Sequence, residues 1–278
     1  MAQQHWDDIA APVDIRLIAA DMDGTLLDAD SQLPAGFWPL LDRLQQHGVT
    51  FVPASGRQLA TLQSMFGRAQ RPLSFIAENG NVVTCDGQVI ETHGVDSAIA
   101  RRTMDMVDEI SEDIGLVVCG LQSAYIQRTD DAFVAECAKY YRKLKEVGDL
   151  RETLAYADET ILKLAIFDFG DVESFAAREL GYIAAPYEYV VSGKHWVDIM
   201  DASVNKGTGL RALQRRLGVT PAQTAAFGDY LNDTPMFADA DYSFAVANAH
   251  PDVKAAARYL APANTEEGVI RTIDHLLG

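Results

Sequence analysis

Short apolar runs alternate with amphipathic segments in the first third of the chain. Residues 15–20 (IRLIAA) and residues 49–55 (VTFVPAS) are mostly apolar and too short for helices, which is typical of strands buried on both faces of a parallel sheet. Residues 34–48 (PAGFWPLLDRLQQHG) and residues 56–69 (GRQLATLQSMFGRA) instead repeat their apolar positions at helical spacing. This alternation predicts the strand–helix–strand units of a doubly wound α/β domain.

The pattern changes over residues 73–94, where apolar runs come in neighbouring pairs separated by the turn residues Asn79-Gly80 and Asp86-Gly87. Beyond them, we expect helices over about residues 96–114, 131–146 and 171–180. Strands are expected over residues 115–120, 123–129, 161–169, 187–193 and 195–200. Paired strands mixed with helices predict an α+β unit inserted into the first domain.

The α/β rhythm returns from residue 206 to the last helix, which ends at residue 278. We therefore expect an α/β protein with a Rossmann-like, doubly wound parallel-sheet core and an inserted α+β domain. The expected limits are residues 1–84 and 191–278 for the core and residues 85–190 for the insertion. A chain of 278 residues is long enough for two such domains.

Composition narrows the range of partners. The formal net charge is −17, and long-range repulsion then disfavours nucleic acid or an anionic membrane as a partner. Three widely spaced cysteines suggest neither a disulfide framework nor a zinc site. The first 14 residues lack the basic start and apolar segment of a signal peptide, and no apolar stretch is long enough for a membrane helix. We expect a cytoplasmic protein, with no prediction of its oligomeric state.

Acidic residues follow two of the expected strands directly. Asp21 and Asp23 come after residues 15–20, and Asp229 and Asp233 come after residues 224–228. Ligands of open α/β sheets bind beyond the carboxyl ends of the strands. Carboxylates gathered there repel one another unless one is protonated or a cation is present. A divalent cation with oxygen ligands, Mg²⁺ being the natural choice, would neutralise them and hold a phosphoryl group.

Phosphoryl transfer also needs donors for the equatorial oxygens. Ser55 offers a hydroxyl and Gly56 an amide where a third strand ends and a helix begins. Lys206 offers a positive charge at another helix start. The sequence therefore predicts a carboxylate nucleophile, an acid/base, a metal site and a phosphate clamp at one edge of the sheet.

The motifs in this order resemble those of the haloacid dehalogenase superfamily. "DMDGTLL" (residues 21–27) resembles its first motif, "ASGR" (54–57) its second, Lys206 its third and "GDYLND" (228–233) its fourth. The large insertion between the second and third motifs is similar to that of the Cof-type, subfamily IIB sugar-phosphate and cofactor phosphatases, whose insertion is a type 2 cap domain. "FIAENG" (75–80) resembles the Asn-Gly element of that subgroup, although Asn81 follows where a small apolar residue is usual.

The resemblance implies a role for each matching position. Asp21 would attack phosphorus and bind the metal, and Asp23 would act as general acid and base while its backbone carbonyl binds the metal. Asp229 would be the third metal ligand, with Asp233 behind it orienting metal-bound water or Lys206. Ser55 and Lys206 would hold the phosphoryl oxygens. The other expected phosphate- or substrate-binding positions are Met22, Gly24, Gly56, Asn79 and Asn232.

Each motif taken alone has a simpler structural interpretation. Asp-x-Asp-Gly is a common turn sequence, Ser55 is a good helix cap, and an isolated Lys206 would be a solvated charge. Their joint occurrence favours a magnesium-dependent phosphatase that hydrolyses small phosphorylated metabolites through an aspartyl-phosphate. The sequence leaves two alternatives open, a phosphosugar mutase and a non-catalytic phosphate-sensing module.

Overall fold

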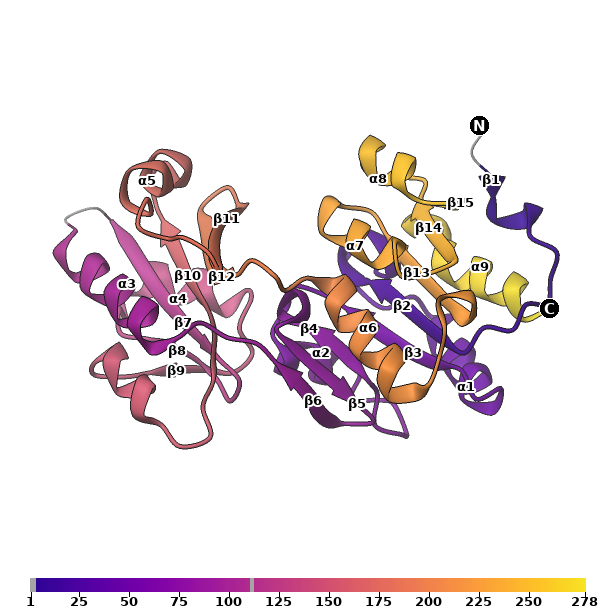
Figure 1. The fold of residues 1–278 in the computed structure, drawn as a ribbon, viewed down its shortest axis with the longest axis horizontal. Coiled ribbons are helices and arrows are strands. Elements are labelled where there is room, and N and C mark those ends of the chain that lie inside the picture. The colour runs from indigo at the N-terminus through magenta and orange to yellow at the C-terminus, as the bar shows by residue number, and fades with distance from the viewer. Residues whose placement is uncertain (1–3, 111–112) are drawn as a thin grey trace. The chain divides into compact units, whose positions relative to one another are not determined.

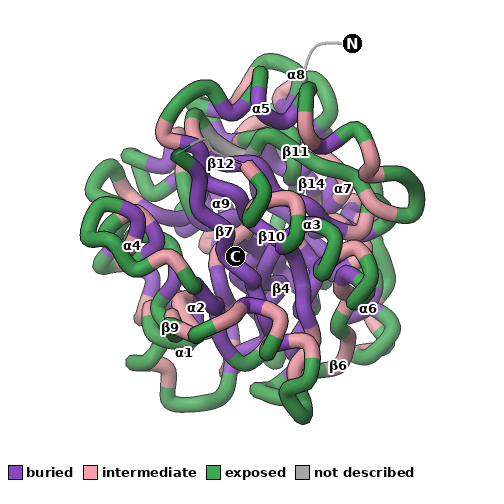
Figure 2. The backbone as a smooth tube through the Cα atoms, turned by 90° about the vertical axis from the view of Figure 1, so that its left-hand side faces the viewer, coloured by how far each residue is buried: buried purple, intermediate pink, exposed green. Residues whose placement is uncertain are grey.

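The computed structural model describes residues 4–110 and 113–278, which form two compact units. The first unit comprises Met1–Gly56, Met65–Glu91 and Asn205–Gly278, and the second comprises Arg57–Ser64 and Thr92–Val204. Figure 2 shows the buried segments concentrated in strands, with exposed segments in loops and along helices.

The first unit contains a sheet of nine strands among the described residues (Figure 1). Strands β1 to β4 and β13 to β15 of this sheet pair in parallel, and β5 is antiparallel to β4. The order across the sheet is β1 (Gln4–His5), β15 (Tyr259–Ala261), β14 (Tyr242–Val246), β13 (Thr224–Gly228), β2 (Leu17–Asp21), β3 (Thr50–Ala54), β4 (Phe75–Ala77), β5 (Val82–Cys85) and β6 (Gln88–Thr92).

All five residues of β2 and of β13 are buried, as expected for central strands covered on both faces. Two groups of helices contact this sheet. Helix α1 (Phe37–Gln46) packs against α9 (Gly268–Leu277), and α6 (Lys206–Leu217) packs against α7 (Thr234–Phe237). A further short helix, α8 (Pro251–Ala256), follows β14. The expected α/β parallel-sheet core is thus confirmed.

Strands β5 and β6 are the last strands of the core before the second unit begins. The turn Asp86-Gly87 connects them, and both of its residues have positive φ angles, 50° and 78°, as the expected hairpin requires. The expected insertion over residues 85–190 lies in the second unit except for residues 85–91. Residues 191–204, which were expected in the core, also belong to the second unit, because Trp196–Asp201 pairs with two strands of the second sheet.

The second unit contains a sheet of six strands among the described residues, antiparallel except for its last pair. Its order is β11 (Tyr187–Gly193), β12 (Trp196–Asp201), β10 (Ile161–Asp168), β7 (Ile114–Gly120), β8 (Ala124–Ile126) and β9 (Leu144–Glu146). One face, which includes Leu164 and Ile166, is covered by α3 (Ser97–Glu109) and α5 (Val172–Glu179). The other face, with Ala165 and Phe167, packs against α4 (Asp131–Ala138) through Phe133 and Cys137.

The largest differences from the predicted helices occur in α2, α3 and α4. Helix α2 covers Leu59–Met65 instead of residues 56–69. Helix α3 begins after the capping carboxylate of Asp96 but ends at Glu109, because Ile114 starts the buried strand β7. Helix α4 ends at Ala138 instead of residue 146, because the following chain pairs with β8 as β9.

The turn before β9 is also fixed by a long-range contact. The Lys143 amide donates to Oε1 of Gln58 at 2.9 Å, and Nε2 of Gln58 donates back to the Lys143 carbonyl at 3.0 Å. Both residues belong to the second unit. Such tertiary hydrogen bonds leave no local signal in a helical pattern.

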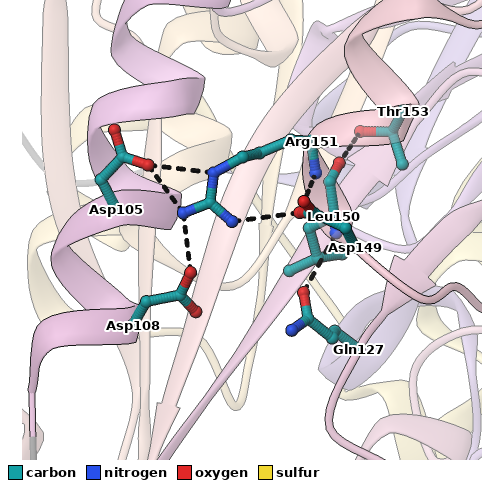
Figure 3. Close-up of polar contacts among 7 residues, drawn as sticks. All are labelled: Asp105, Asp108, Gln127, Asp149, Leu150, Arg151 and Thr153. Carbon is teal, nitrogen blue, oxygen red and sulfur yellow. Dashed lines mark hydrogen bonds and ion pairs between the residues drawn. The ribbon is translucent and has the colours of Figure 1, made fainter.

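An exposed ion cluster joins α3 to the short 3₁₀ helix η4 (Leu150–Ala155) in the second unit. Its members, which we call the surface ion cluster, are Asp105, Asp108, Asp149 and Arg151 (Figure 3). The guanidinium group of Arg151 donates to Asp105 at 2.6 Å and to Asp108 at 2.7 Å. It also donates to Asp149 at 3.0 Å, so one side chain links two elements.

Candidate active site

Three neighbouring parallel strands of the first unit end beside one another. Asp21 is the last residue of β2 and pairs with Ala54, the last residue of β3. On its other side β2 pairs with β13, which ends at Gly228, directly before Asp229. Parallel strands end at the same edge of a sheet, so the fold itself gathers Asp21, Ser55 and Asp229.

A buried lysine joins two of the predicted carboxylates. Nζ of Lys206, the first residue of α6, donates to Oδ1 of Asp21 and, at 2.7 Å, to Oδ1 of Asp233. Lys206 is 1% exposed and Asp233 is fully buried. We call Asp21, Lys206, Asp229 and Asp233 the core ion cluster.

Burial dominates the electrostatics of this cluster. It raises the pKa of the Asp21 carboxyl well above the usual range, opposed by the Lys206 ammonium and reinforced by the Asp233 carboxylate. Burial alone would lower the pKa of Lys206, but the carboxylates of Asp21 and Asp233 outweigh it, so that pKa rises. The pKa of Asp229 is raised as well, chiefly by burial.

Asp229 and Asp233 are fixed by short polar contacts. The Thr25 hydroxyl donates to Oδ1 of Asp229 at 2.8 Å. The amides of Asp229 and Tyr230 donate to Oδ2 of Asp233 at 2.9 and 3.0 Å. Gly24 lies against Asp229, and a Cβ added at Gly24 would stand 2.5 Å from Oδ2 of Asp229. The φ angle of Gly24, +80°, also favours glycine.

The donor set fits a hard divalent cation. One carboxylate oxygen from each of Asp21, Asp229 and Asp233 lies within 4.8 Å of the others, and oxygen ligands are those that Mg²⁺ prefers. Three carboxylates and one ammonium leave two excess negative charges in a largely buried place, which a cation would offset. The exposed side chain of Asp23 is not in this group, so its expected backbone contact with the metal stays a prediction.

A second group of predicted residues meets beside β3. Ser55 is 2% exposed, and its backbone carbonyl accepts from the Asn79 amide at 3.0 Å. Oδ1 of Asn79 accepts a hydrogen bond from Nδ2 of Asn232 at 3.1 Å. This contact occupies the oxygen of the Asn79 amide group and leaves its Nδ2 to donate elsewhere. Nδ2 of Asn79 would be 3.1 Å from a Cβ added at Gly56. The structure thus brings together residues 55, 56, 79 and 232 from separate parts of the chain.

Asn81, the departure noted in the sequence, is fully buried. Its Nδ2 donates to the Glu78 carbonyl at 2.8 Å, while Oδ1 has no hydrogen-bond partner. It closes the short 3₁₀ helix η3 (Glu78–Gly80) that carries Asn79, whose φ is +56°. Asn81 therefore supports the backbone of the Asn-Gly element.

The sequence interpretation missed three polar residues around this site. Thr25 holds Asp229, Asn248 donates to the Gly24 carbonyl, and Asn264 donates to the Leu27 carbonyl. Asn248 follows β14 closely, so the rule of polar residues after a buried strand could have found it. Thr25 lies within the first motif, residues 21–27, but no role was assigned to it, and Asn264 carries no signal beyond its hydrogen-bonding side chain.

Comparisons with known proteins show the family to which the chain belongs. A family model described as haloacid dehalogenase-like hydrolase matches residues 18–273. The chain is 32% identical to 5-amino-6-(5-phospho-D-ribitylamino)uracil phosphatase YbjI of Escherichia coli (strain K12), over 95% of this chain and 96% of the relative. It is 30% identical to phosphoglycolate phosphatase of Methanothrix thermoacetophila, over 94% of this chain and 97% of the relative.

A crystal structure of a protein from Eubacterium rectale has the same fold, with a TM-score of 0.84 and 27% identity over 94% of this chain and 98% of that one. Within the described residues, every helix is too short or too polar to cross a membrane. The chain belongs to the haloacid dehalogenase-like hydrolases and is a phosphoric monoester hydrolase of that family.

Proposed function

We propose that the protein is a magnesium-dependent phosphatase that hydrolyses small phosphomonoesters through an aspartyl-phosphate on Asp21. The observation that carries the proposal is the core ion cluster, in which Asp21, Asp229 and Asp233 converge around Lys206. A purely structural role would not explain an excess of buried negative charge at the ligand-binding edge of the sheet.

The proposed reaction has two steps. A carboxylate oxygen of Asp21 attacks phosphorus, the bond from phosphorus to the alcohol oxygen breaks, and Asp23 donates its proton to the departing alkoxide. Asp23 then takes a proton from water, which attacks the aspartyl-phosphate. The bond between phosphorus and Asp21 breaks, and inorganic phosphate leaves. The exposed position of Asp23 suits a group that must reach both the alcohol and water.

Binding groups surround the expected position of the phosphoryl oxygens. Lys206 and the Ser55 hydroxyl would hold two of these oxygens, assisted by the amides of Met22, Gly24 and Gly56. The side chains of Asn79 and Asn232 would donate to the phosphate or the leaving group. Mg²⁺, held by Asp21, Asp229 and the backbone of Asp23 with Asp233 behind them, would neutralise charge on the phosphoryl group.

We further propose that the second unit acts as the cap domain, excludes bulk water and selects the leaving group. Its mainly antiparallel sheet with helices on both faces supports this proposal, because an α+β unit is what we expect of the insertion. Sugar phosphates are the first substrate class to test. The phosphoribitylaminouracil in the name of the relative from Escherichia coli is a phosphomonoester of a sugar alcohol, which supports that choice.

A phosphate-release screen tests the proposal. The panel consists of glucose 6-phosphate, ribose 5-phosphate, erythrose 4-phosphate, flavin mononucleotide, pyridoxal phosphate and p-nitrophenyl phosphate, each with Mg²⁺ and with a chelator. We expect release from at least one sugar phosphate, lost on chelation. Isomerised sugar phosphate without release of phosphate would favour a mutase. Absence of turnover across the panel would favour a phosphate-sensing module.

A further inference from the structure

The backbone that carries Asp23 forms a tight turn. Asp23 has φ −76° and ψ 121°, and Gly24 has φ 80° and ψ −7°, which are the central angles of a type II β-turn over Met22–Thr25. Glycine is the most freely rotating residue in a chain. A hydrogen bond to the carbonyl of Gly24 therefore restricts the turn beyond what its own backbone does.

Asn248 supplies that contact from the neighbouring strand end. Nδ2 of Asn248 donates to the Gly24 carbonyl at 2.7 Å. Asn248 follows β14 closely, and β14 pairs with β13, the strand that ends before Asp229. It therefore reaches the turn from the same edge of the sheet as the core ion cluster.

Asn264 in turn fixes the amide group of Asn248. The backbone amide of Asn264 donates to Oδ1 of Asn248 at 3.0 Å, which leaves Nδ2 directed at Gly24. The side chain of Asn264, 9% exposed, donates to the Leu27 carbonyl at 2.9 Å. The Leu27 amide itself donates to the Met22 carbonyl at 2.9 Å. The turn is thus held on both sides of Asp23.

We infer that Asn248 is a positioning residue, which sets the reach of Asp23 by fixing the Gly24 carbonyl. The inference rests on the proposed function, in which Asp23 protonates the leaving alkoxide. Misplacement of such a group by about 1 Å can cost on the order of 10²-fold in rate. The cost depends on the leaving group, because p-nitrophenolate departs with little protonation and a sugar alkoxide needs a proton.

The test compares kcat/KM of Asn248→Ala for two esters from the panel. One is p-nitrophenyl phosphate, and the other is the sugar phosphate that the wild type hydrolyses fastest. The value of kcat/KM reports the steps up to departure of the alcohol. The ratio of the two values does not depend on the fraction of enzyme that is folded, so a merely structural effect leaves it unchanged.

We expect Asn248→Ala to lower kcat/KM for the sugar phosphate at least about tenfold and that for p-nitrophenyl phosphate less than about threefold. The matched control is Gln223→Ala, which removes an amide donor to Asp14 (2.8 Å) next to the opposite end of β13. This variant should keep both values. Equal losses on both esters, or none, would overturn the inference while leaving the proposed function intact. A wild type inactive on both esters would instead contradict the proposed function.

Discussion

The two ion clusters of this protein have the same balance of charges in different surroundings. Each has one cation among three carboxylates, and each has a formal charge of −2. In the core ion cluster the side chains of Lys206 and Asp233 are 0% exposed and that of Asp21 is 10% exposed. In the surface ion cluster Arg151 is 25% exposed, and its carboxylate partners are between 46% and 53% exposed.

This difference decides what each cluster can do. Water and salt screen the excess charge around Arg151, so the contacts brace α3 and η4 without need of another ion. The excess charge around Lys206 has little water to screen it, and a cation bound there gains the most. Acidity alone would mark both clusters as metal sites. Burial at the ligand-binding edge of the sheet marks only the core ion cluster.

The largest expected effect is the loss of turnover when the core ion cluster loses its nucleophile. Asp21→Asn keeps the size of the side chain but cannot form an aspartyl-phosphate, so phosphate release should fall at least about 10³-fold. The matched variant Asp105→Asn in the surface ion cluster should keep wild-type turnover. Circular dichroism checks that both variants fold. Turnover by Asp21→Asn within tenfold of the wild type would exclude a nucleophilic role for this residue.

Removal of the central cation should destabilise the protein much more in the core ion cluster than in the surface ion cluster. Lys206→Met leaves the buried carboxylates of Asp21 and Asp233 without a cation to offset their charge, which should lower the free energy of unfolding by about 3–5 kcal/mol. Urea titration followed by fluorescence in a metal-free buffer measures this change. A loss smaller than about 1 kcal/mol would mean that water screens the core ion cluster as strongly as it screens the surface ion cluster.

Magnesium should stabilise the protein through the core ion cluster only. At a concentration 100-fold above its Kd, a ligand of the native state adds about 2.7 kcal/mol to the free energy of unfolding. We expect a rise in Tm on addition of Mg²⁺ that Asp229→Asn abolishes and Asp149→Asn retains. The opposite assignment, with the rise lost in Asp149→Asn, would place the cation at the surface ion cluster.

Replacing the cation of the surface ion cluster should change little. Arg151→Met removes the contacts to Asp105, Asp108 and Asp149, but exposed ion pairs contribute little each. We expect Tm to fall by at most about 3 °C, with kcat/KM for the best sugar phosphate unchanged. A loss of unfolding free energy as large as that of Lys206→Met, measured by the same urea titration, would show that burial does not distinguish the clusters.

The sequence predicted the regions in which local pattern and tertiary structure agree. Strands β2 and β13 are buried along their length and β3 is buried except at Thr50, so their apolar runs were sufficient to find them. The end of α4 was missed because it is set by pairing of β9 with β8, a contact without a helical or apolar signal.

The candidate site was likewise predictable only where its residues lie in motifs or follow buried strands. Acids that directly follow strands were recognised from motif and position, and the fold brings Asp21, Asp229 and Asp233 together. Asn248 and Asn264 act through hydrogen bonds to backbone carbonyls far away in sequence. The partners of these contacts are set by the tertiary structure and could not be read from the residue types, although the position of Asn248 shortly after a buried strand could have marked it as a candidate.

The smallest expected effect is a pH dependence confined to the surface ion cluster. The pKa of Asp149 is lowered by the hydrogen bond from the Arg151 amide and then by the Arg151 side chain. A lowered pKa in the folded state contributes stability above the unfolded value, near 3.9, and this contribution is lost as the pH falls through the folded value.

Asp149→Asn should therefore be slightly less stable than the wild type at pH 6. The difference in urea midpoint should shrink as the pH falls from 6 toward and below about 3.9. Because the carboxylate is half-exposed, added salt should reduce the same difference at pH 6. A difference that grows on acidification would mean that Asp149 is held in its neutral form, contrary to its contacts with Arg151.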